Sequence, residues 1–231
     1  MKQETCNNNT CVIPADVFRR IYLYTIIEKF ENGVYGAIRL QKVAYVSERD
    51  NSNIKSFTYK KHYFGEFSDQ LEDTKEQLIS LGFIKAVPLD NIHKESMQIG
   101  DKKYVSVSTG NRYIASDKDN VKFYESIIAK AYPEIIELID QAISKYGYLK
   151  EPDLLKRCYD FEEFKNKEDG EIIFETNLPE WVQVPTLTND ECEDLILSFT
   201  PSFIDFASKI SDGMERATIE WGKIRKVVLK V

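Results

Sequence analysis

The chain has 231 residues, of which 42% are hydrophobic and 12% aromatic, and its formal net charge at pH 7 is −7. This length and apolar content allow a sizeable buried core and exclude an intrinsically disordered chain. No apolar run approaches the roughly 18 residues of a membrane span, and the polar, Asn-rich start does not resemble a secretory signal, so we expect no membrane association.

Three helices are predicted in the first part of the chain. Apolar residues recur with helical spacing over 16–31 and again over 37–49. A third helix is predicted to begin after Ser68, because serine is a good N-cap and acidic side chains follow it, where the helix dipole favours them. We expect this third helix to end at Leu81.

Strands are predicted on both sides of the third helix. The residues over 57–64 alternate well enough for a first strand, and those over 83–89 and 103–108 suggest two more. We expect the last two to form a two-stranded ribbon, joined by a polar loop containing Gly100, with a short helical turn over 109–114. Three helices followed by a ribbon is the order of a winged helix, whose third helix and wing usually contact nucleic acid.

The second half of the chain is predicted to be mostly helical. Helices are expected over 120–146 and 152–164, and the polar residues over 165–170 are the best candidate for a linker. Beyond them we expect, in chain order, a strand over 171–176, a proline-bounded segment over 178–185, helices over 190–197 and 202–214, and a last strand over 224–231. The predicted class is therefore α+β and mainly helical. It has a winged-helix-like domain with additional helices at 1–165 and a small acidic strand–helix extension at 166–231.

No motif in the chain indicates catalysis. Two histidines are present, and the sequence contains no phosphate-binding loop, dinucleotide fingerprint, nucleophile elbow or metalloprotease signature. The four cysteines (Cys6, Cys11, Cys158 and Cys192) lie far apart and form no metal-like pairing. We therefore expect a cytoplasmic protein that is not an enzyme, with no catalytic residue, no metal and no cofactor.

Charge is concentrated in one part of the chain. Residues 151–200 hold 4 basic and 14 acidic side chains, a net charge of −10. Such a segment repels nucleic acid and suits a basic protein partner. A solvated helical surface explains the same excess equally well, so both interpretations stay open.

Three local patterns in order resemble the Panacea-type family of antitoxins and its winged-helix relatives. They are Arg39-Leu40-Gln41-Lys42-Val43-Ala44-Tyr45, Tyr63-Phe64-Gly65-Glu66-Phe67-Ser68 and Tyr104-Val105-Ser106-Val107-Ser108-Thr109-Gly110. The resemblance covers about residues 16–160, and the chain departs from the family by having Gly65-Glu66 where a Gly-Pro turn is usual. It implies a protein without enzymatic activity that binds a toxin, DNA or another macromolecule.

The first hypothesis is an antitoxin-like protein that binds and neutralises a basic toxin. The acidic segment would meet the basic partner, and aromatic side chains would supply apolar anchors. The residues assigned to this contact are Trp181, Asp190, Glu191, Phe199, Phe203 and Phe206. Because the three phenylalanines share one helical face, packing of this stripe on the rest of the fold is the favoured alternative.

The second hypothesis is a winged-helix regulator that binds DNA. Lysines of the strand, the third helix and the wing would contact phosphates, and polar side chains would reach base edges. The residues assigned to this contact are Lys60, Lys61, Gln70, Lys75, Lys102 and Lys103, with a supporting basic patch of Arg19, Arg20, Arg39 and Lys42. Four acidic residues on the third helix oppose this reading. Association of two copies through the aromatic helices also stays open.

Overall fold

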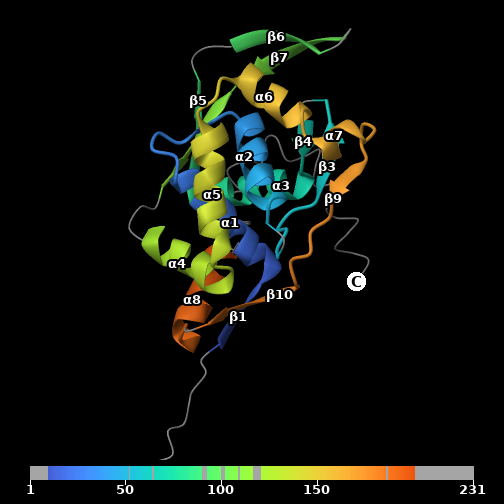
Figure 1. Ribbon diagram of the computed structural model, residues 1–231. Helices are drawn as coiled ribbons and strands as arrows, with labels where there is room; N and C mark the ends of the chain where they lie inside the picture. Colours follow the sequence, from blue (N-terminus) through green and yellow to red (C-terminus); the bar gives the residue numbers. More distant parts are fainter. Residues whose placement is uncertain are drawn as a thin grey trace, which may run out of the picture. The chain divides into compact units, whose positions relative to one another are not determined.

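The computed structural model describes residues 10–51, 53–63, 65–89, 93–99, 102–108, 110–116, 121–185 and 187–200 (Figure 1). Of 93–99 and 102–108 it describes the backbone. The chain divides into two units, Met1–Phe199 and Thr200–Val231, and every element described below belongs to the first. The helix predicted over 202–214 and the strand predicted over 224–231 lie outside the described residues. Among the helices that are described, none has the length and apolar character needed to span a membrane.

The fold is of the predicted α+β class. The helices are α1 (Ala15–Glu28), α2 (Ala37–Arg49), α3 (Asp69–Ser80), α4 (Val121–Ala131), α5 (Glu134–Ala142), a π-helical turn (Ile143–Gly147), α6 (Glu151–Tyr159), α7 (Glu162–Lys165) and α8 (Asn189–Phe199). The strands are β1 (Thr10–Pro14), β2 (Val34–Tyr35), β3 (Tyr59–His62), β4 (Gly65–Phe67), β5 (Ile84–Pro88), β6 (His93–Ile99), β7 (Lys102–Ser108), β8 (Asn111–Ala115), β9 (Ile172–Phe174) and β10 (Trp181–Pro185). They form small sheets in the orders β1-β10, β2-β8-β5, β4-β3-β9 and β6-β7.

The central element of the core is α1. Its apolar residues are buried on every side of the helix: Val17, Phe18, Ile21, Tyr22, Leu23, Tyr24, Ile26 and Ile27. A helix that is buried on every side must be surrounded by other elements, and α1 contacts α2, α3, α4 and α8 (Figure 1).

The three helices predicted in the first part of the chain are confirmed as α1, α2 and α3. The second predicted helix coincides with α2, and α3 begins directly after Ser68. The Ser68 hydroxyl accepts a hydrogen bond from the backbone N–H of Leu71 at 3.2 Å, which is the N-cap contact expected from the sequence.

The predicted ribbon is wrong in its pairing. β5 pairs with β8, and β8 occupies residues that were predicted to form a helical turn. β8 is the middle strand of its sheet, so its backbone groups bond to β2 on one side and β5 on the other, which a helical turn could not do. The hairpin of this region is instead formed by β6 and β7.

The two long helices predicted in the second half are each interrupted. α4 ends at Ala131 and α5 begins at Glu134, on either side of Pro133, which lacks a backbone N–H and disfavours helical backbone before it. The second predicted helix is divided into α6 and α7 at Phe161, whose backbone is extended with ψ of 132°.

Residues 166–199 belong to the same unit as the residues before them. β9 extends the β4-β3 hairpin to a three-stranded sheet, and β10 pairs with β1 over five residues. Because these strands take their partners from the beginning of the chain, the acidic segment is built into the fold.

A carboxyl group is buried within this core. The Glu48 side chain on α2 accepts a hydrogen bond from the backbone N–H of Phe57 at 3.2 Å through Oε2. Its Oε1 has no hydrogen-bond partner among the described residues. Burial removes the carboxylate from water and raises the pKa of Glu48 to about 8, although the Phe57 N–H and the nearby Lys55 act in the opposite direction.

We expect this group to make stability depend on pH. The ordinary pKa of a glutamate is 4.5, so between pH 4.5 and about 8 the folded chain holds a proton on Glu48 that the unfolded chain releases. The stability contributed by Glu48 is therefore fully present below pH 4.5 and lost as the pH rises to about 8, by at most about 1.4 kcal/mol per pH unit. Denaturant unfolding of the wild type and of Glu48→Gln at several pH values between 5 and 8 measures the difference. A constant difference across this range would show that Glu48 does not titrate there.

Candidate functional site

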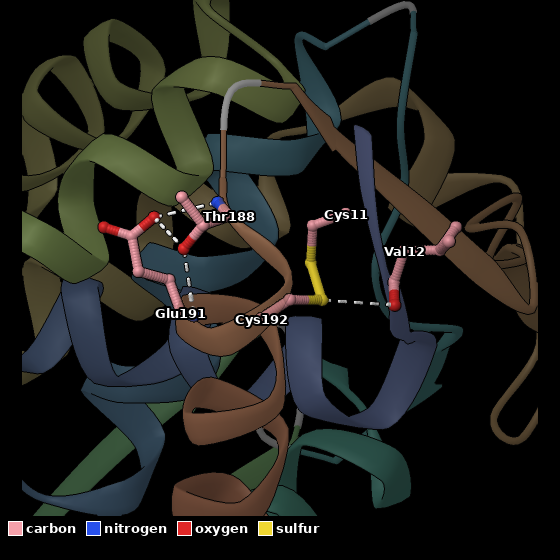
Figure 2. The surroundings of a disulfide bond; sticks show 5 residues. All are labelled: Cys11, Val12, Thr188, Glu191 and Cys192. Atoms are coloured by element: carbon pink, nitrogen blue, oxygen red, sulfur yellow. Dashed lines mark hydrogen bonds between the residues drawn. A yellow bond between two sulfur atoms is a disulfide. The ribbon is translucent and has the colours of Figure 1, made fainter. Parts of the chain in front are cut away.

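The last described helix begins with a capping box. The Thr188 hydroxyl accepts a hydrogen bond from the backbone N–H of Glu191 at 3.2 Å, and Glu191 Oε2 accepts from both the backbone N–H and the hydroxyl of Thr188 at 2.9 Å (Figure 2). These two hydrogen bonds to the carboxylate lower the pKa of Glu191. Glu191, predicted as a partner contact, thus fixes the start of α8 while remaining exposed.

The inner face of α8 packs on the core. Leu195 and Phe199 are buried, and the Phe199 ring stacks on Phe83 with ring centroids 4.1 Å apart. The same ring meets the edge of Tyr124, and the backbone carbonyl of Phe199 accepts a hydrogen bond from Arg20 Nη1 at 2.5 Å. Phe199 is therefore part of the core and is unavailable as an exposed anchor. Phe203 and Phe206 lie outside the described residues.

The outer face of α8 is acidic with one apolar residue. Its exposed side chains, Asp190, Glu193, Asp194 and Leu197, are spaced as neighbours on one side of a helix. Leu197 is 65% exposed. α8 itself has no lysine or arginine, so Asp190, Glu193 and Asp194 give this face a negative charge.

The β1–β10 ribbon adds apolar surface beside α8. Directly opposed residues of antiparallel strands lie on the same side of a ribbon, so the pairs Val12–Gln183 and Pro14–Trp181 share one face. Trp181 is 55% exposed and Val12 is 45% exposed. Trp181, a predicted contact residue, is thus available to a partner.

A hollow lies between β1 and α8. It has a volume of about 450 Å³, is open to solvent, and is lined by Cys11, Val12, Asn189, Cys192, Glu193, Ile196 and Leu197. Val12 therefore belongs both to the exposed face of the ribbon and to the hollow. We define the acidic-apolar face as Val12, Trp181, Asp190, Glu193, Asp194 and Leu197.

A disulfide crosses the floor of this region. Cys11 of β1 and Cys192 of α8 are bonded although they are 181 residues apart in the chain (Figure 2). The cysteines were expected to form no metal-like pairing, and nothing in their spacing indicated this disulfide. Sequence separation does not limit pairing once β1 and α8 are adjacent in the fold.

The residues predicted to contact DNA are largely engaged within the chain. Lys75 is buried, 3.2 Å from Glu76 and also paired with Glu72, and Lys60 pairs with Asp69 at 2.6 Å. Lys61 donates to two backbone carbonyls, and Gln70 Oε1 accepts a hydrogen bond from the backbone N–H of Thr58. Lys102 and Lys103 begin β7, where the structure describes the backbone and not the side chains.

The supporting basic patch is engaged as well. Arg19 donates to the carbonyl of Ser56, Arg20 contacts Asp16 and Gln77, and Arg39 donates to the carbonyl of Gly147. Because each guanidinium has an intramolecular partner, this patch presents less free positive charge than the sequence indicated.

Residues of the first two motifs meet in a buried contact between α2 and the segment that runs from β4 to α3. Gln41 donates its amide N–H to the Ser68 carbonyl at 3.1 Å and accepts from the Ser68 backbone N–H at 3.0 Å. Lys42 Nζ donates to the Glu66 carbonyl at 2.6 Å and lies 3.3 Å from Glu66 Oε2. The sequence assigned Lys42 to a basic patch that would contact DNA, and its burial in an ion pair is a correction.

Cys158 lies in the same buried region as Lys42 and Glu66. Cysteine, glutamate and lysine are residue types that could support nucleophilic chemistry. Burial raises the pKa of the Cys158 thiol well above its usual range, and the nearby Glu66 acts in the same direction. A thiol that stays protonated and buried is a poor nucleophile, so these contacts suit a structural role.

Comparison of the chain with family models, with curated proteins and with solved structures finds no match in any of the three. In the part of the chain that the structure describes, no three His, Cys, Asp or Glu side chains cluster as a metal site would require.

Proposed function

We propose that this chain is a non-enzymatic binding protein of the antitoxin type, which captures a basic toxin protein on the acidic-apolar face. The observation that carries the proposal is the outer side of α8, where Asp190, Glu193 and Asp194 lie beside the exposed Leu197. Carboxylates would steer a cationic partner, and Leu197 and Trp181 would supply the apolar contacts that anchor it.

Two further observations support this proposal. The inner side of α8 is fixed by Phe199 and by the disulfide, so the outer side is held in one orientation before a partner arrives. The ordered motifs that resemble the Panacea-type antitoxins point to the same class of function.

Reversing one charge of the face tests the proposal. Asp190→Lys is expected to weaken binding of a basic partner at least tenfold and to reduce its dependence on salt. The partner is first identified by affinity capture from nuclease-treated lysate with mass spectrometry, and its affinity is then measured by calorimetry at two salt concentrations.

Asp153→Lys is the matched control. Asp153 is also an exposed acidic residue in the first turn of a helix, α6, so both changes carry a similar penalty from the helix dipole. Equal binding by the two variants would remove α8 from the interface.

A winged-helix DNA-binding regulator is the second candidate. The order α1, α2, α3 followed by the β6–β7 hairpin favours it, with Lys102 and Lys103 at the start of β7. In that case the double variant Lys102→Ala/Lys103→Ala should bind DNA more weakly and with a smaller salt dependence. Absence of DNA binding by the wild type at low salt would remove this candidate.

A further inference from the structure

We propose that the Cys11–Cys192 disulfide is a thiol-exchange site, at which a dithiol reductant releases the first turns of α8 from β1. The bond joins the first strand to the last helix of the unit (Figure 2). Its reduction would therefore act on the acidic-apolar face without touching the central core.

The disulfide is accessible from one side. Cys11 is buried, whereas Cys192 is partly exposed on α8. Both residues line the open hollow of about 450 Å³ between β1 and α8. A small dithiol can enter a space of this size, and it would attack the sulfur of Cys192, the more exposed of the two residues.

The two ends of α8 are held in different ways. At the carboxyl end, Leu195 and Phe199 are buried, and Arg20 donates to the Phe199 carbonyl. At the amino end, Thr188, Asn189, Asp190 and Glu191 are exposed, and the capping-box hydrogen bonds stay within the helix start itself. Leu187 and Leu195 are buried on either side of this stretch of chain. Within the stretch, the disulfide at Cys192 is the covalent link to β1.

The exchange proceeds in two balanced steps. A thiolate of the dithiol attacks Cys192 Sγ, the bond to Cys11 Sγ breaks, and Cys11 leaves as a thiolate that takes up a proton. The second thiol of the reductant then loses its proton and attacks the reductant sulfur bound to Cys192. This releases Cys192, which takes up a proton, and leaves the reductant as a cyclic disulfide. Two electrons pass to the protein, and the reductant supplies both protons.

The position of the bond favours its reduction. Exposed disulfides are more easily reduced than buried ones, and Cys192 is partly exposed.

Any effect of reduction on partner binding rests on the proposed function, but the change in α8 does not. Asp190, Glu193 and Asp194 lie on the turns that the disulfide tethers. Reduction would therefore loosen the carboxylates that the proposed function assigns to the partner. The test below measures the helix directly, so it succeeds or fails whether or not a basic partner exists.

Hydrogen exchange of the full chain tests the proposal. It is measured by mass spectrometry before and after treatment with dithiothreitol, in a Cys6→Ser background that removes a competing thiol. Alkylation and peptide mapping confirm that Cys11 and Cys192 are reduced. We expect the backbone amides of residues 192–194 to exchange at least tenfold faster after reduction, while those of α1 stay unchanged.

Two results would overturn the proposal. One is unchanged exchange over residues 192–194 in chains whose Cys11 and Cys192 are shown to be reduced. The other is a disulfide that dithiothreitol reduces only after the chain has been denatured. As a second measurement, Cys11→Ser/Cys192→Ser should exchange rapidly in this segment without reductant and respond no further when it is added.

Discussion

Replacing Phe199 with alanine is expected to lower the free energy of unfolding by about 3–5 kcal/mol. The Phe199 ring is buried, stacks on Phe83 and meets the edge of Tyr124, so its removal leaves a cavity lined by two aromatic rings. Urea denaturation followed by fluorescence measures the change. The same variant keeps every side chain of the acidic-apolar face but removes one of the contacts that hold α8 in its orientation.

Leu197→Ala is the matched control on the same helix. Leu197 is exposed two residues earlier, so its truncation should change the free energy of unfolding by no more than about 0.5 kcal/mol. It should instead weaken partner binding, because Leu197 is the apolar centre of the face. Similar losses of stability for both variants would mean that the two sides of α8 are wrongly assigned.

Removing the charge of Lys42 is expected to lower the free energy of unfolding about as much as removing the Phe199 ring. Lys42→Met leaves the Glu66 carboxylate buried without its cation, which should lower the free energy of unfolding by about 3–5 kcal/mol. Burial already raises the pKa of Glu66, against the opposing effect of Lys42. Without Lys42, Glu66 is expected to fold as the neutral acid, so the loss should be smallest near pH 4 and increase as the pH rises. Denaturant unfolding at pH 4, 6 and 8 measures it.

The double variant Lys42→Met/Glu66→Gln separates charge from packing. Neutralising both partners removes the uncompensated charge, so most of the lost stability should return. If the double variant is as unstable as Lys42→Met alone, the loss comes from packing between α2 and β4 rather than from a buried charge.

Local signals predicted much of the helical structure. Ser68 and the acids after it located the start of α3, and the apolar spacing over 37–49 located α2, because capping and helical periodicity act over a few neighbouring residues. The effect of Pro133 on α4 and α5 was also readable from the sequence but was overlooked.

Tertiary partners decided what local signals could not. The residues of β8 become a strand because β2 and β5 lie on either side of them, and nothing in their own sequence specifies those partners. Lys42 was assigned to a DNA-contacting basic patch by its charge, yet its partner Glu66 lies 24 residues away in the chain. The bond between Cys11 and Cys192 spans 181 residues, and spacing alone carries no sign of it.

For the candidate site, the composition of the acidic segment was the informative signal. It directed attention to Asp190 and Glu191 on α8, and both are exposed. Of the aromatic stripe, Phe199 does not serve as an exposed anchor, because its ring packs inward, as the favoured alternative expected. Phe203 and Phe206 lie outside the described residues. Leu197 was missed, and its spacing from Asp190 and Asp194 on one helical face is the signal that would have found it.

The measurement that tests the central claim most directly is rescue of cell growth. The basic protein captured by the chain is expressed together with the wild type, with Asp190→Lys or with Asp153→Lys, and colonies are counted. We expect growth to stop with the captured protein alone, to return with the wild type and Asp153→Lys, and to stay arrested with Asp190→Lys. Normal growth with the captured protein alone, or equal rescue by all three chains, would contradict an antitoxin that acts through the acidic-apolar face.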